Sequence, residues 1–74
     1  MNKAIDYLKR ELEVKLIEDG FFYSIFESDK CRVKLIFRDR TFRRDDYKIF
    51  INNYMIEFTR WSDLYGIVDS FKNN

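Results

Sequence analysis

The sequence predicts a single α+β domain, in which an antiparallel sheet of three or four strands is flanked by an N-terminal and a C-terminal helix. Apolar residues recur at helical spacing at both ends of the chain, and the middle is rich in β-branched and aromatic residues. The 74 residues include eight Phe, five Tyr and one Trp. Large rings bury roughly 150 to 250 Å² each, so they help a short chain to form a core. We expect one compact domain over residues 1–74.

The first predicted element is a helix over residues 2–19. Apolar side chains at spacings of three and four form one stripe, and Gly20 lies where a left-handed cap would end the helix. A competing interpretation makes Asp19-Gly20 the turn of a hairpin between residues 14–18 and 21–26. The sequence leaves both open for residues 14–18. The residues of the helical stripe are Ala4, Ile5, Leu8, Leu12 and Leu16.

The middle of the chain predicts the sheet. Residues 21–27 and 31–38 read as a hairpin joined by the polar turn 28–30. After a loop over residues 39–46, the runs KIFI and YMIEF flank Asn52-Asn53. Asparagine tolerates the positive φ angles of tight turns, so residues 47–58 form either two strands or one long bent strand.

The last predicted element is a helix that Thr59 can cap. Its broad apolar face predicts packing on the same side of the sheet as the first helix, which completes the order αβββ(β)α. The residues of this face are Trp61, Leu64, Tyr65, Ile67, Val68 and Phe71.

Composition favours binding over catalysis. The chain has no His and a single Cys, Cys31, which we expect on the inward face of its strand. General acid–base and nucleophilic mechanisms therefore lack their usual participants, and no metal or cofactor site is indicated. No apolar run is long enough for a membrane span and no signal peptide is evident, so we expect a cytoplasmic protein, in the host cell if a phage encodes it.

Basic residues concentrate in residues 30–48, where eight bases face three acids, a net charge of +5. In an extended strand, Arg32 and Lys34 share a face, and the loop that follows carries further arginines. Such a surface could bind a protein partner or follow a phosphate backbone, with Phe42 and Tyr47 stacking on bases. The alternative is a solvated outer face whose cations are partly neutralised by nearby acids. The predicted basic surface comprises Arg32, Lys34, Arg38, Arg40, Arg43 and Arg44.

A second candidate surface lies on the first predicted helix. Tyr7, Glu11, Val14 and Glu18 are spaced by four, three and four residues beside the apolar stripe. An acidic face with one aromatic and one aliphatic residue could contact a basic protein groove. The alternative is that Tyr7 and Val14 only broaden the buried face of the helix.

In its size, α+β architecture and lack of catalytic residues, the chain resembles small phage and mobile-element proteins that disarm bacterial defence, the anti-CRISPR proteins especially. The resemblance implies a non-enzymatic inhibitor or adaptor that docks on a nucleic-acid-handling protein, as a nucleic-acid mimic or binder. One alternative is a direct nucleic-acid binder that uses the Arg- and Lys-rich residues 30–48. Another is a small homo-oligomeric structural protein that pairs through an exposed sheet edge. The sequence does not decide the oligomeric state.

Overall fold

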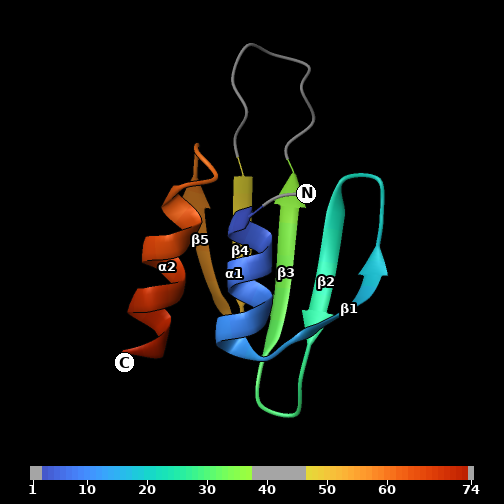
Figure 1. Cartoon of the computed structure of the whole chain (residues 1–74). Helices are drawn as coiled ribbons and strands as arrows, with labels where there is room; N and C mark the ends of the chain where they lie inside the picture. Colours follow the sequence, from blue (N-terminus) through green and yellow to red (C-terminus); the bar gives the residue numbers. More distant parts are fainter. Residues whose placement is uncertain (1–2, 38–46, 74) are drawn as a thin grey trace.

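A computed structural model describes residues 3–37 and 47–73 of the chain (Figure 1). A helix comes first, a series of strands follows, and a second helix closes the described chain. The elements are α1 (Lys3–Leu12), β1 (Lys15–Asp19), β2 (Tyr23–Glu27), β3 (Arg32–Phe37), β4 (Tyr47–Ile51), β5 (Tyr54–Phe58) and α2 (Asp63–Lys72).

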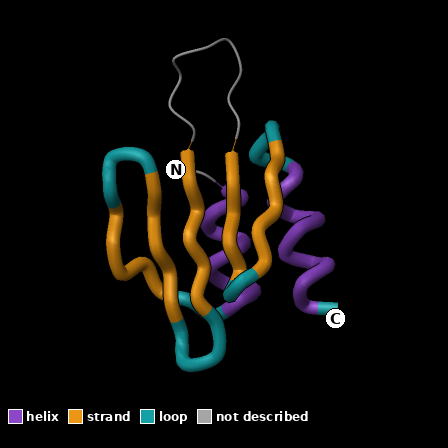
Figure 2. The backbone as a smooth tube through the Cα atoms, turned by 180° about the vertical axis from the view of Figure 1, so that it is seen from behind, coloured by secondary structure: helices purple, strands orange, loops and turns teal. Residues whose placement is uncertain are grey.

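The strands form one antiparallel sheet in the order β1-β2-β3-β4-β5, so each strand pairs with its neighbour in the sequence. Both helices lie on the same face of the sheet, and the opposite face is open (Figures 1 and 2). The predicted α+β class is confirmed. The described sheet has five strands rather than three or four, because residues 15–19 form a strand.

The core lies between the sheet and the two helices. Apolar side chains alternate along the central strands and meet one stripe of each helix, as the periods of a strand and a helix require. The side chains with no exposed area are Leu8 of α1, Val33, Leu35 and Ile49 of the sheet, and Leu64 and Val68 of α2. No helix in the described part of the chain is both long and apolar enough to cross a membrane.

The prediction of a helix over residues 2–19 was wrong beyond Leu12. Glu13 adopts a left-handed conformation with φ of 56°, and the N–H of Val14 donates to the carbonyl of Lys9 at 3.1 Å, which ends the helix. Val14 then turns into the core, and the following residues pair with β2. The competing hairpin is therefore correct. The backbone hydrogen bonds between β1 and β2 stabilise residues 15–19 more than one further helical turn, with Leu16 on its apolar stripe, would have done.

Gly20 does not cap a helix but lies in the turn between β1 and β2, where its N–H donates to the carbonyl of Tyr23 at 2.8 Å. A Cβ atom at this position would lie 2.3 Å from Cε1 of Tyr23. The close approach of that ring therefore requires glycine.

The turn of Asn52 and Asn53 separates two strands, which confirms the first of the two interpretations of residues 47–58. Asn52 has φ of 57°, in the region that asparagine tolerates. The predicted cap at Thr59 was wrong: α2 begins at Asp63 with Ser62 as its N-cap residue. A turn in which Asp63 N–H donates to the carbonyl of Arg60 at 2.9 Å occupies the intervening residues.

Candidate binding surface on the open sheet face

The alternation of side chains along β3 decides which residues reach the open face. Val33 and Leu35 point to the helices and are fully buried, whereas Arg32 and Lys34 point away and are exposed. Strand register carries this assignment across the sheet, because residues directly opposite each other share a face. Phe50 of β4 lies opposite Lys34, so it belongs to the open face.

Two rows of side chains run across the strands on the open face. The first row is Glu18, Ile25, Lys34, Phe50 and Met55, and the second is Tyr23, Ile36, Lys48 and Glu57. In both rows the cation lies on a central strand and an acid lies on an outer one. We call these nine residues, together with Glu27, Arg32 and Asn52, the open-face surface.

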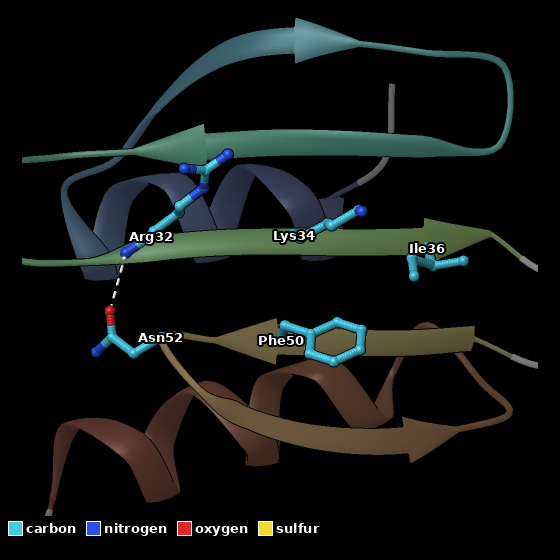
Figure 3. A pocket seen from close by; sticks show the side chains of 5 residues that line it. All are labelled: Arg32, Lys34, Ile36, Phe50 and Asn52. Atoms are coloured by element: carbon cyan, nitrogen blue, oxygen red, sulfur yellow. Dashed lines mark hydrogen bonds between the residues drawn. The ribbon is translucent and has the colours of Figure 1, made fainter.

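A hollow of about 370 Å³ lies at the centre of the open-face surface (Figure 3). Arg32, Lys34 and Ile36 line it from β3, and Phe50 and Asn52 line it from β4 and the turn that follows. Figure 3 shows the Phe50 ring on the strand beside Lys34, between the ends of the hollow that Arg32 and Ile36 mark. An apolar floor thus carries two cationic side chains at its rim.

The Asn52 turn holds one end of the hollow in place. Arg32 N–H donates to Oδ1 of Asn52 at 3.1 Å, and Asn52 N–H donates to the carbonyl of Arg32 at 2.8 Å (Figure 3). Because the left-handed backbone of Asn52 is part of this exchange, the position of the Arg32 backbone depends on the turn.

Acids on the flanking strands contact the cations of the open face. Arg32 Nη1 lies 4.0 Å from Glu27, and Lys48 Nζ lies 3.9 Å from Glu57. Lys34 Nζ lies 5.6 Å from the centre of the Tyr23 ring, a cation–π contact. Exposed ion pairs of this kind contribute little to stability, so replacing them with ion pairs to a partner would cost the fold little free energy.

Tyr23 connects the flanking hairpin to this surface. Its hydroxyl donates to Oε2 of Glu18, and this hydrogen bond, more than the charge of Glu18, raises the pKa of Tyr23. On the other face of the same hairpin, Ser24 Oγ donates to Oδ1 of Asp19 at 2.6 Å. The ring of Tyr23 is therefore fixed beside Lys34.

The structure describes part of the predicted basic surface. Arg32 and Lys34 lie together on the open face with Ile36, as the strand period predicted. Tyr47 was wrongly assigned to base stacking, because its ring packs on the helix side of the sheet. The centre of this ring lies 5.2 Å from the centre of the Phe58 ring and 4.6 Å from that of Trp61. The predicted residues Arg38, Arg40, Phe42, Arg43 and Arg44 lie outside the described residues.

The predicted acidic surface does not form one helix face. Tyr7 and Glu11 lie on α1, but Val14 follows the helix and is 4% exposed, and Glu18 lies on β1. The two helical members hold α1 against α2. Tyr7 donates to Asp69, which raises the pKa of Tyr7 to about 12, and Glu11 accepts from Lys72. Glu18 instead joins the open-face surface beside the basic residues.

Phe50, Lys48 and Tyr23 were absent from the predicted site. The alternation of KIFI places Lys48 and Phe50 on one face, but only the register with β3 shows that this face is the one that carries Lys34. Tyr23 depended in the same way on the pairing of β2 with β3.

Cys31, the single cysteine of the chain, lies within the described residues. Cys31 is buried, and burial raises the pKa of its thiol above its ordinary value, which disfavours the thiolate. Across residues 3–37 and 47–73, no three Cys, Asp or Glu side chains gather in a way that could hold a metal ion. Comparison of the chain with protein-family models, with curated proteins and with solved structures found no match.

Proposed function

We propose that the protein is a non-enzymatic inhibitor or adaptor that docks through the open-face surface on a protein that handles nucleic acid. The observation that carries the proposal is the hollow on the uncovered face of the sheet, where Phe50 lies opposite Lys34 and Arg32 and Ile36 mark the two ends. An aromatic anchor with charged neighbours is the usual composition of an energetically important contact between proteins.

The distribution of charge favours a protein partner over a phosphate backbone. Carboxylates of Glu18, Glu27 and Glu57 share the open face with the cations, and two of them are within 4.0 Å of a cationic group. A polyanion would be repelled by these acids, whereas a protein surface with both signs of charge can match them. The partner that fits best presents carboxylates around an apolar side chain that fills the hollow.

The choice of a nucleic-acid-handling partner rests on the resemblance to anti-CRISPR proteins. Small size, an α+β fold and a sequence without the usual catalytic residues are the features that the chain shares with them. An inhibitor of this kind would act by occupying an effector surface, for which the uncovered sheet face with its hollow is suited.

Captured partners provide the test of the proposal. The tagged protein is incubated with host lysate, with and without nuclease, and retained proteins are identified by mass spectrometry. The binding of a retained protein is then measured for Lys34→Glu and Phe50→Ala, and we expect each variant to weaken it by about tenfold or more. Lys3→Glu on α1 and Phe21→Ala at the β1–β2 turn are the matched controls, and they should bind like the parent.

Two results would contradict the proposal. One is a protein complex that survives both open-face substitutions while their circular dichroism spectra match the parent. The other is retention that nuclease removes, which would favour the direct nucleic-acid binder. The observation that favours this second candidate is that Phe50 lies opposite Lys34 and shares its face of β4 with Lys48. If the three described cations of the open-face surface, Arg32, Lys34 and Lys48, each contact one phosphate, the logarithm of the affinity for nucleic acid should fall with the logarithm of the salt concentration with a slope of about −2 to −3.

A further inference from the structure

The outer edge of β5 offers backbone groups to another strand. Asn52 N–H donates to the carbonyl of Arg32 in β3, so by alternation the backbone of Ile51 points to β5. Ile51 lies opposite Tyr54, and therefore the next residue of β5, Met55, directs its N–H and C=O away from the sheet, as does Glu57. Within the described residues no strand pairs with β5 on this side.

An apolar hollow of about 500 Å³ accompanies this edge. In both views α2 stands on the side of β5 that faces away from β4 (Figures 1 and 2). Tyr54 and Ile56 are 75% and 36% exposed, although they point to the helix face of the sheet. The helix thus extends over space that the described strands do not fill. The residues that line this hollow are Ile51, Tyr54, Ile56, Ile67, Ser70 and Phe71.

We propose that an extended segment of a partner polypeptide adds as a further strand beside β5, with alternate side chains in the hollow under α2. In this mode of binding, hydrogen bonds between the backbones of the two strands supply affinity, and pockets that receive every second side chain of the segment supply specificity. The site shares Met55 and Glu57 with the open-face surface, but its backbone contacts and its hollow belong to the outer edge of β5, so it does not depend on the proposed function.

The chemistry of the edge defines the segment. Side chains that point to the helices meet a hollow lined mostly by Ile, Phe and Tyr, so they are apolar. Side chains that point to the open face lie beside Met55 and Glu57, and Glu57 is the one charged residue of β5. The Glu57 carboxylate is paired with Lys48 at 3.9 Å, but this exposed pair is weak and a cation on the facing strand can share it. Opposite charges on facing strands attract and like charges repel, so this half of the segment is basic. The segment that fits alternates apolar residues with Lys or Arg.

A second copy of the chain fits less well. An antiparallel pair of β5 strands related by a two-fold axis keeps the helices of both copies on one face of the joined sheet. The second α2 would then compete for the space beside β5 over which the first α2 already extends. The hollow accepts a strand that brings no helix with it.

Two synthetic peptides provide the test. The probe Thr-Val-Lys-Val-Lys-Val-Thr is compared with Thr-Val-Glu-Val-Glu-Val-Thr by fluorescence anisotropy and by amide chemical shifts of the labelled protein. We expect the lysine peptide to bind about fivefold more tightly and to shift the amides of Met55 and Glu57. The variant Glu57→Lys should reverse the preference between the two peptides.

Further variants distinguish binding at the β5 edge from binding elsewhere on the protein. Ser70→Trp, which fills the hollow, should abolish peptide binding, whereas Asp29→Trp in the β2–β3 turn and Phe50→Ala on the open face should leave it unchanged. Equal binding of the two peptides, or shifts that avoid β5, would overturn the proposal. It would also be overturned if the free protein formed a dimer that Ser70→Trp dissociates, since the occupant would then be a second copy.

Discussion

The two faces of the sheet differ in what their side chains do. On the helix face, Leu35 and Ile49 have no exposed area, and they lie opposite each other in the register of β3 and β4. On the open face, the next residues along the strands, Lys34 and Phe50, remain in contact with solvent and line a hollow. One pair of strands thus carries core residues on one side and the proposed binding surface on the other, because side chains in a strand alternate.

Ile49→Ala and Phe50→Ala test this division most strongly, since they truncate neighbouring residues on opposite faces of β4. We expect Ile49→Ala to lower the free energy of unfolding by about 3 kcal/mol, because it leaves a cavity among fully buried side chains. Phe50→Ala should lower it by about 1 kcal/mol or less and still weaken partner binding. Urea unfolding measures both, and similar losses for the two variants would show that the open face also acts as core.

Substitution of the two glycines should change stability by an intermediate amount, and in opposite directions. Gly20→Ala forces its new methyl group against the Tyr23 ring, so we expect a loss of about 1 to 2 kcal/mol and displacement of Tyr23 from Lys34. Gly66→Ala meets nothing within 4 Å and removes a mid-helix glycine, so it should raise stability by about 0.5 to 1 kcal/mol. Thermal unfolding of both variants measures the difference, and equal effects would contradict the close approach at Gly20.

The smallest effect concerns the ion pair between the helices. The hydrogen bond from Lys72 lowers the pKa of Glu11 below its usual value, so this pair stabilises the fold above the pKa of the unfolded carboxyl. The contribution is lost as pH falls through the lowered pKa. Glu11→Gln should therefore lower the melting temperature by about 2 °C or less at neutral pH, and the difference from the parent should vanish in acid. A difference that is constant with pH would exclude the ion pair as its cause.

The sequence predicted the fold class well because the spacings of apolar residues that indicate a helix or a strand can be recognised within a short stretch of sequence. Alternation predicted Cys31 on the inward face of its strand and Arg32 and Lys34 together on one face, and the conformational tolerance of asparagine made a turn at Asn52 one of two interpretations. The helix over residues 2–19 was too long because Leu16 continues the helical stripe, and only the pairing of β1 with β2 overrides it.

The open-face surface could be predicted only in part, because it is assembled by register. Lys34 and Phe50 are sixteen positions apart, and no local pattern places them opposite each other. The acidic set failed for a related reason: the spacing of Tyr7, Glu11, Val14 and Glu18 is a helical pattern, and the helix ends before its last two members. Errors in element boundaries thus became errors in the site.

The meeting of the two helices also has a consequence for the order of folding during synthesis. Every strand pairs with its sequence neighbour, so the sheet can assemble from short-range contacts, whereas Tyr7 reaches Asp69 across 62 positions. Leu64 and Val68 enter the core only with α2. A nascent chain that has emerged as far as β5 would therefore expose its apolar sheet face, and chaperones could bind it until α2 leaves the ribosome.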